Sequence, residues 1–333
     1  MHRVFKILLV VVALVAAVVF GAWVLMLWMP GSSFEGEPPP MDEELKELAA
    51  QLERDVRVFA DEIGPRHVEA PQGLEESVEF LEDELQQVGY DPKRQTFEVQ
   101  GVDCHNVEVE IEGSEHPDEI VIFGAHYDSF LDTPAANDNA SGVAANLHLA
   151  RYFADADPER TLRFVFFVNE EPPWFQTEKM GSYQYAKRSD ERGEDIVAMV
   201  SLETIGYYSD EPGSQEYPVG MLSWMYGDQG NFIAIVGNVA SRSVLREATG
   251  AFRDTAVVPS ESAALPGFTP GVGWSDHWAF WQFDFPGIMF TDTALFRYPY
   301  YHTAQDTAEK LDYETMARVV EGVEGVVEAL VVD

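Results

Sequence analysis

The sequence predicts an α/β domain of three layers, in which helices cover both faces of a mixed, mostly parallel central sheet. Two features of the chain favour this fold. Short apolar segments alternate with amphipathic segments along most of the 333 residues, as strands and their crossover helices do. Several apolar segments carry almost no polar residue, which is typical of strands buried on both faces. With 46% hydrophobic residues, the chain can build one large core.

The N-terminal segment is expected to lie outside this domain. Ile7 to Met29 is an unbroken apolar run, preceded by Arg3 and Lys6. At about 1.5 Å per residue, a helix of this length spans the ~30 Å hydrocarbon core of a membrane. We therefore expect a single-pass signal anchor in the cell membrane. A signal peptide that is cleaved to release a secreted protein is the alternative.

The expected domain boundaries follow from this segment. Residues 1–6 would be cytoplasmic and residues 7–29 would be the transmembrane anchor. Residues 30–41 are rich in Gly, Ser, Glu and Pro, which indicates a linker. Residues 42–333 would form the folded domain on the extracytoplasmic side.

Helices are predicted where apolar residues recur every three or four positions. The first runs from Asp42 to Phe59, with Leu45 and Leu48 in this spacing, and a Gly-Pro-Arg turn at 64–66 ends it. The further predicted helices cover 73–88, 141–153, 179–189, 243–252 and 311 to the C-terminus. The predicted strands cover 94–99, 106–111, 119–123, 163–168, 196–202, 231–236 and 287–290.

The charge balance argues against a nucleic-acid-binding protein, and the cysteine count excludes an intramolecular disulfide. The chain has 21 basic and 58 acidic residues, a net charge of -37. A polyanion of this size repels nucleic acid, so we expect no nucleic-acid partner. The one cysteine, Cys104, excludes an intramolecular disulfide.

Ionisable side chains follow four of the predicted strands, at or beyond the point where each strand ends. They are His126 and Asp128, the pair Glu170 and Glu171, Glu203, and His302. In open α/β sheets, sites form at the carboxyl ends of the strands. Zinc hydrolysis needs imidazole and carboxylate ligands together with a free carboxylate as base. The pattern therefore predicts a site for a two-zinc hydrolase at one edge of the sheet.

The pair His126 and Asp128, and also Asp138 in the segment between Asp128 and Glu170, each have an alternative interpretation. Asp128 could orient the His126 ring through its second N–H, or the two could be a buried histidine beside a turn aspartate. Asp138 lies in a polar loop before a helix and could cap it. Ser141 could take that role and leave Asp138 free to bridge two metals.

The adjacent carboxylates of Glu170 and Glu171 follow a buried apolar strand. They would repel one another unless cations are present. One can bind zinc while its neighbour takes a proton from the attacking water. A solvated charge pair is the alternative.

These residues lie in short motifs that occur in a fixed order. The motifs are His-x-Asp at 126–128, Asn-Asp-Asn-Ala-Ser-Gly-Val at 137–143, Asn-Glu-Glu at 169–171, Ser-Leu-Glu-Thr-Ile-Gly at 201–206, Ser-Asp-His at 275–277 and Tyr-His-Thr at 301–303. Together they resemble the co-catalytic zinc aminopeptidase family, metallopeptidase family twenty-eight. That family includes bacterial secreted aminopeptidases, glutamate carboxypeptidase II, the transferrin receptor ectodomain and glutaminyl cyclases. The resemblance extends from about Leu45 to Val331.

The resemblance implies a zinc exopeptidase fold of the phosphorylase/hydrolase type over 42–333 and two zinc ions per chain. It implies that Asp138 bridges the two ions. His126 and Glu203 would complete one site, and Glu171 and His302 the other. The chain departs from the family pattern at Glu203, where the family usually has aspartate.

The resemblance also implies catalytic roles. Glu170 would be the general base, Tyr301 would stabilise the oxyanion, and Asp128 would orient an imidazole. A second departure is Asn139, where many relatives have aspartate, and we expect the amide to keep the geometry of the turn. Asp276 and His277 would support the wall of the site.

The activity implied is that of an aminopeptidase acting on peptides with a free N-terminus. A glutaminyl-cyclase-like acyltransferase with one zinc is the alternative, and a non-catalytic ectodomain of the same fold is a third possibility. Aromatic residues near the motifs could line an apolar substrate pocket. They are Trp174, Phe175, Trp274, Trp278, Trp281, Phe296, Tyr298 and Tyr300.

Overall fold

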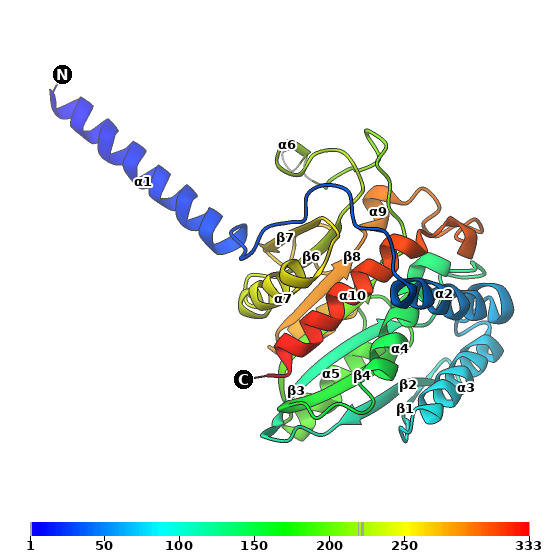
Figure 1. Cartoon of the computed structure of the whole chain (residues 1–333). Helices are drawn as coiled ribbons and strands as arrows, with labels where there is room; N and C mark the ends of the chain where they lie inside the picture. The colour runs from blue at the N-terminus through cyan, green and yellow to red at the C-terminus, as the bar shows by residue number, and fades with distance from the viewer. Residues whose placement is uncertain (1, 219, 221–222, 333) are drawn as a thin grey trace.

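The computed structural model describes residues 2–218, 220 and 223–332, and it confirms the three-layer α/β/α fold (Figure 1). The strands are β1 (Lys93–Val99), β2 (Val102–Ile111), β3 (His116–His126), β4 (Arg160–Phe167), β5 (Asp195–Glu203), β6 (Ile233–Asn238), β7 (Ser260–Leu265) and β8 (Gly287–Thr291). They form one eight-stranded sheet in the order β1-β2-β4-β3-β5-β8-β6-β7.

The centre of this mixed sheet is parallel and both of its ends contain antiparallel pairs. β4, β3, β5 and β8 run in the same direction, so their carboxyl ends meet at one edge. β1 and β2 are added antiparallel at one end. At the other end β6 is antiparallel to β8, and β7 is parallel to β6. β6 and β7 therefore begin at the edge where the four central strands finish.

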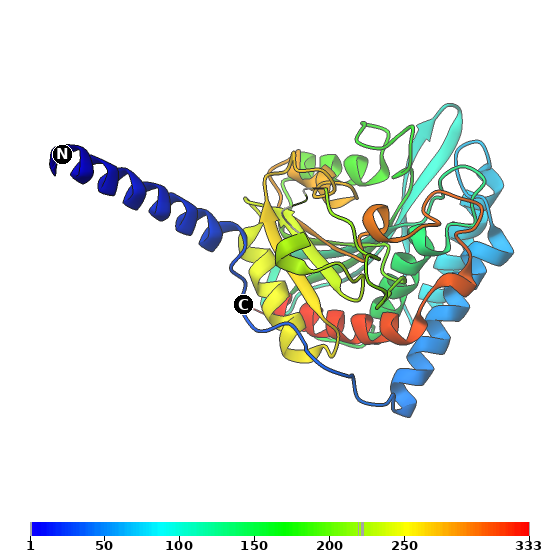
Figure 2. The ribbon, with the colours of Figure 1, turned by 90° about the horizontal axis from the view of Figure 1, so that it is seen from above.

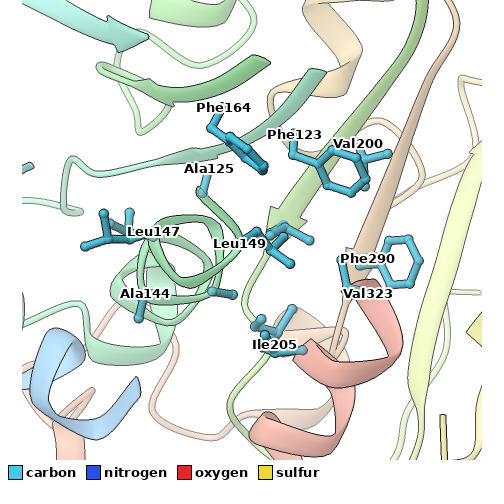
Figure 3. Packing of buried hydrophobic residues seen from close by; sticks show 14 of the residues in the cluster. Phe123, Ala125, Ala144, Leu147, Leu149, Phe164, Val200, Ile205, Phe290 and Val323 are labelled. Carbon is cyan, nitrogen blue, oxygen red and sulfur yellow. The ribbon is translucent and has the colours of Figure 1, made fainter. Parts of the chain in front are cut away.

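Five helices cover one face of the sheet: α2 (Glu43–Arg57), α3 (Pro71–Gln87), α4 (Gly142–Tyr152), α7 (Arg242–Thr255) and α10 (Tyr313–Leu330). On β3, Val121 and Phe123 point into the core beneath them. Figure 3 shows Phe123 packed in this core with Leu147 and Leu149 of α4. The main core therefore lies between the sheet and these helices.

The opposite face is covered by α5 (Gly181–Arg192) and α8 (His277–Trp281). Ile120 and Ile122, which alternate with the two β3 residues of the main core, belong to this second cluster, as does Phe280 of α8. Because successive residues of a strand point to opposite faces, a strand covered on both sides needs an unbroken apolar sequence. That requirement explains the apolar runs by which the central strands were predicted.

The helix predicted from Asp42 to the turn at 64–66 is α2 followed directly by the helical turn η1 (Val58–Ile63). The sequence did not predict β7, α8 or α9 (Ala294–Arg297), nor the helical turns η2 (Ala136–Ser141), α6 (Ser223–Tyr226) and η3 (Ala308–Lys310). β7 reads Ser-Glu-Ser-Ala-Ala-Leu, without the β-branched and aromatic residues that favour strands. The tertiary pairing of β7 with β6 decides its conformation. The other elements are too short for a helical period to show.

The N-terminal helix α1 (His2–Met26) extends away from the domain (Figure 2). Its apolar part, Phe5–Met26, is long enough to cross a membrane. The chain after it lies against the domain: the Arg246 guanidinium lies 4.1 Å from the centroid of the Trp28 ring. Ser33 Oγ accepts a hydrogen bond from the backbone of Ser260. Trp28, in the predicted anchor segment, thus contacts α7, and Ser33, in the predicted linker, contacts the edge strand β7.

Arg66, in the predicted turn at 64–66, is fully buried. Its guanidinium donates hydrogen bonds to the backbone carbonyls of Phe59, Gly64, Tyr127, Pro134 and Ala135. Burial lowers its pKa to about 10, against the raising effect of nearby carboxylates. Arg66 therefore remains a cation at neutral pH and fastens the end of β3 to two neighbouring loops.

Replacing Arg66 by methionine (Arg66→Met) should lower the free energy of unfolding by about 3–5 kcal/mol, because the buried carbonyls lose their donor. Urea unfolding followed by tryptophan fluorescence measures this change. The control is Arg57→Met, at a partly exposed residue paired with Glu53 and Asp61, where a loss below about 1 kcal/mol is expected. Equal losses in the two variants would contradict the role of Arg66.

His277 of α8 makes the stability of the fold dependent on pH. It is fully buried, its Nε2–H donates to the carbonyl of Val272, and burial lowers its pKa to about 4. The unfolded chain, with a histidine pKa near 6.5, takes up a proton first as the pH falls. The stabilisation is therefore complete above pH ~6.5 and is lost between there and pH ~4, by about 3 kcal/mol in total.

The test compares the unfolding free energies of the wild type and His277→Gln between pH 4 and 7. Glutamine keeps an N–H donor for Val272 and does not titrate. The difference between the two proteins should change across this interval and be constant above it. Parallel curves over the whole range would rule out the proposed contribution of His277.

Candidate metal centre

The structure brings the predicted metal ligands together in two groups at the carboxyl edge of the sheet. One group is His126, Asp138 and Glu203, and the other is Asp138, Glu171 and His302. Within each group the ligand-type atoms lie within 4.8 Å of one another. Asp138 belongs to both groups, so the two possible metal positions are adjacent and share one carboxylate.

His126 is the last residue of β3 and is completely buried. Its Nε2 lies 3.4 Å from Asp138 Oδ1 and 3.3 Å from Glu203 Oε2. Its other ring nitrogen, Nδ1, lies 3.4 Å from Asp128 Oδ1. The ring is thus aimed at one ligand group by a carboxylate behind it, as expected for a metal-binding histidine.

Asp128 also fixes the segment that follows β4. Its two carboxylate oxygens accept hydrogen bonds from the backbone N–H groups of Glu170 (3.0 Å) and Glu171 (3.1 Å). The aspartate therefore sets the position of both glutamates as well as the direction of the His126 ring. The sequence suggested only the second of these contacts.

The loop that carries Asp138 is held by Asp306, which the sequence did not single out. Asp306 accepts hydrogen bonds from the backbone N–H groups of Asn137 (2.8 Å) and Asp138 (3.1 Å), and from the hydroxyl of Tyr298 (2.8 Å). Nothing in its local sequence, four residues after His302, distinguishes it from a surface aspartate. Only the folded chain brings it beneath the loop.

Asn139 uses both halves of its side-chain amide. Its Oδ1 accepts hydrogen bonds from the backbone N–H groups of Gly142 and Thr204, and its Nδ2 donates to the carbonyl of Leu202. A Cβ on Gly142 would come within 2.2 Å of the Leu202 oxygen, so this close packing also requires glycine. An aspartate could accept the first two bonds but could not donate the third. The departure at Asn139 therefore has a structural cause.

Glu203 ends β5 and is held by serines. Ser275 Oγ donates to Glu203 Oε2 at 2.8 Å and is itself hydrogen-bonded to Ser201 Oγ at 2.8 Å. Glu203 is one methylene longer than the aspartate usual in the family, and its carboxylate still lies in one ligand group with His126 and Asp138. The Ser-Asp-His motif thus contributes a serine that orients this carboxylate.

His302 lies flat between two aromatic rings. The ring centroids are 4.0 Å apart for Phe130 and 3.9 Å apart for Tyr301, both in stacked geometry. His302 Nε2 lies 3.0 Å from Asp138 Oδ2 and 3.1 Å from Glu171 Oε2. The stacking restricts the ring to the plane in which it meets the two carboxylates.

The electrostatics of the centre reflect an excess of negative charge. Burial raises the pKa of Glu171 to about 8, and Asp138 adds to this shift. Burial also raises the pKa of Glu170 well above its usual value, with further contributions from Glu203 and Glu171 that oppose the effect of His126. Burial alone would lower the pKa of His302, but the nearby carboxylates of Asp138 and Glu171 raise it to about 10. The cluster therefore favours any bound positive charge.

The donor atoms fit a pair of metal ions. His126 Nε2, Asp138 Oδ2, Glu171 Oε1 and His302 Nε2 are buried without a hydrogen-bond partner among the described residues. Buried polar atoms are rarely left unpaired, and such orphans indicate an ion that belongs there. Imidazole nitrogen together with carboxylate oxygen is a set that zinc accepts.

Tyr301 joins this centre to a cavity of about 140 Å³. Tyr301 and Glu203 both line it, and apolar side chains form most of the remaining wall. Of the aromatic residues considered from the sequence, Trp274 and Phe296 line this cavity. Trp278, in contrast, packs against the core beneath α5 and α8, and Tyr298 is buried.

Comparison with known sequences identifies relatives. The family model of peptidase family M28 matches residues 106–327. The uncharacterized protein YfbL of Escherichia coli (strain K12) is 38% identical over 281 residues, which cover 82% of this chain and 85% of YfbL. A probable zinc metalloprotease of Pyrenophora teres f. teres (strain 0-1) is 28% identical over 219 residues. That match covers 56% of this chain and 45% of the fungal protein.

Solved structures share the fold at low identity. BSAP, a zinc aminopeptidase from Bacillus subtilis, has a TM-score of 0.66 and 15% identity, covering 86% of this chain and 95% of BSAP. A glutaminyl cyclase from Fimbriiglobus ruber has a TM-score of 0.59 and 19% identity, covering 89% of this chain and 98% of the cyclase. The same fold thus occurs in a zinc aminopeptidase and in a glutaminyl cyclase.

Asn139→Asp should lower the free energy of unfolding by about 1–3 kcal/mol, because the Leu202 carbonyl loses its donor and faces a carboxylate. Asn238→Asp is the matched control. The Asn238 side chain accepts hydrogen bonds from Ser241 through Oδ1, and aspartate keeps these, so a change within about 0.5 kcal/mol is expected. Chemical unfolding at pH 7 measures both. Asn139→Asp as stable as the control would show that the amide donor is dispensable.

Proposed function

The chain belongs to peptidase family M28, and from this premise we propose that it is an aminopeptidase that removes N-terminal residues of peptides with two zinc ions. The observation that carries the proposal is the sharing of Asp138 between two ligand groups. A shared carboxylate suits two adjacent ions acting on one bond. A single-zinc acyltransferase would not need the second group.

The five ligands divide between the two ions. His126 and Glu203 would hold the first ion, Glu171 and His302 would hold the second, and Asp138 would serve both. Zinc bound by these residues supplies Lewis-acid activation of the attacking water and of the scissile carbonyl. Asp128 keeps the His126 ring directed at its ion and Glu171 in place, and so acts by positioning.

Glu170 is the general base. Among the described carboxylates it lies beside both ligand groups without belonging to either, and its Oε2 is 3.9 Å from His126 Nε2. Its backbone is fixed by Asp128, so its side chain is held at the centre. Glu170 takes a proton from the attacking water as the C–O bond forms. It then gives the proton to the amine that leaves when the C–N bond breaks.

Tyr301 donates its hydroxyl proton in a hydrogen bond to the oxyanion that develops on the carbonyl. Burial, together with the charge of Asp138, raises the pKa of Tyr301 well above its usual value. The hydroxyl therefore keeps its proton at all physiological pH values and remains a donor. The acidic surroundings also attract the protonated amine of a peptide N-terminus.

We place the catalytic domain outside the cell membrane, anchored by α1. The apolar length of α1 and the basic residues Arg3 and Lys6 before it favour an N-terminus in the cytoplasm. Its attachment to α7 and β7 through residues 28–33 would keep the domain close to the membrane. Removal of α1 as a signal peptide is the alternative, and the N-terminal sequence of the mature protein distinguishes the two.

Glu170→Gln should lower kcat for aminoacyl-p-nitroanilides by about 10²–10⁴-fold, because the amide cannot accept the proton of water. Zinc content and unfolding free energy should be unchanged. Glu178→Gln, at an exposed residue of the same loop, is the control and should retain full activity. Chelation should abolish wild-type turnover, and zinc should restore it.

Two results would contradict the proposal. One is no release of p-nitroaniline from any free-amine substrate by zinc-loaded protein. The other is one zinc per chain by metal analysis together with cyclisation of N-terminal glutamine, which would identify the acyltransferase. Full activity on an N-acetylated substrate would instead show that the enzyme does not require a free N-terminal amine.

A further inference from the structure

One row of residues crosses the sheet from the metal centre to the edge strand. Glu203 of β5 is paired with Thr291 of β8, Thr291 with Ala234 of β6, and Ala234 with Glu261 of β7. Paired residues of neighbouring strands point to the same face. Strands are ~4.8 Å apart, so the Cα atoms of the two glutamates are separated by roughly 14 Å. A second carboxylate thus stands on the same face as the metal centre.

The alternation along β7 directs this carboxylate into the cavity. Glu261, Ala263 and Leu265, two residues apart, all line it. Ser262 also borders the cavity, but its hydroxyl accepts a hydrogen bond from Thr249 of α7 on the other face. On the other face of the strand, Ser260 accepts a hydrogen bond from Arg253 of α7. The period of two therefore assigns Glu261 to the cavity, and a slip of one residue would replace it with serine.

The cavity adjoins the metal centre and has room for the side chain of a bound substrate. Glu203 and Tyr301 line it beside the metal centre, and Phe232, Val236 and Met289 form part of its apolar wall. Its volume of about 140 Å³ is close to that of a cavity that takes a benzene molecule. One large side chain fills this space.

Among the described residues, no cationic side chain forms a direct ion pair with the Glu261 carboxylate. The guanidinium of Arg253 donates to Ser260 Oγ, to the Ser260 carbonyl and to the Pro30 carbonyl, and it acts on Glu261 only through its charge. The hydroxyl of Tyr217, which also lines the cavity, is buried without a hydrogen-bond partner among the described residues. Burial raises the pKa of Glu261 to about 7, against the lowering effect of the Arg253 charge.

We propose that this pocket selects an N-terminal lysine or arginine, whose stem packs on the apolar wall and whose cationic head pairs with Glu261. This inference rests on the proposed aminopeptidase function, because the substrate amine and carbonyl must lie at the metal centre. Lysine and arginine have long apolar stems that carry the charge to the far end of such a pocket. An uncharged residue would leave the Glu261 carboxylate buried against hydrocarbon, which is unfavourable.

The test uses lysyl- and norleucyl-p-nitroanilide, since norleucine has the lysine stem without the amine. The wild type should have a kcat/KM at least about tenfold higher for the lysyl substrate, the effect of one partly buried ion pair. Glu261→Gln should reduce the ratio of the two kcat/KM values by at least about tenfold. Glu216→Gln, which removes a charge from an exposed residue at the rim of the same cavity, should change the ratio less than about threefold.

Calorimetric titration with L-lysinamide and L-norleucinamide gives a readout without turnover. Lysinamide should bind the wild type at least about tenfold more tightly than norleucinamide, and Glu261→Gln should remove the difference. Equal binding of the two amides by the wild type, or a preference that survives Glu261→Gln, would overturn the inference. Cleavage without a lysyl preference would leave the peptidase function intact and also reject the pocket assignment. Selective lysinamide binding without cleavage of any substrate would support the pocket and reject the peptidase.

Discussion

The main physical constraint on this structure is the mutual repulsion of the carboxylates that are buried together at one edge of the sheet. Asp138, Glu170, Glu171 and Glu203 surround His126 with little access to solvent, and burial at such a density favours neutral or cation-bound forms. Two zinc ions would balance this charge in one step. In the proposed two-zinc form, metal binding and the folding of this edge would therefore be coupled, since the carboxylates repel one another without bound cations.

The surrounding fold holds these side chains in place against that repulsion. The buried cation of Arg66 fastens the loops around the end of β3, while Asp128 and Asp306 use their oxygens to hold backbone N–H groups. Asn139 and Ser275 supply neutral hydrogen bonds where another charge would be costly. The residues outside the two ligand groups thus position those within them, which is what a preorganised site requires.

The reversal of strand direction at one end of the sheet places the proposed substrate pocket beside the proposed metal centre. Four central strands end at the metal centre, whereas β6 and β7 begin there. The first residues of β7 therefore lie at the same edge of the sheet as the last residues of β5 and β8, with β6 between β7 and β8. An all-parallel sheet would place the start of β7 at the opposite edge, so the mixed topology brings Glu261 into the same cavity as Glu203.

The sequence by itself determined the buried central strands, the order of the motifs and the ligand-type residues that follow them, because apolar runs and strand-end acids are local features. It did not reveal β7, whose small residues carry no strand signal, or Arg66, Asp306 and Glu261, which resemble ordinary surface charges in the sequence. The tertiary structure decided their roles, and it decided that Asp138 lies in both ligand groups. The physical reason is that burial and strand register, which bring residues far apart in the chain into contact, are properties of the packed molecule.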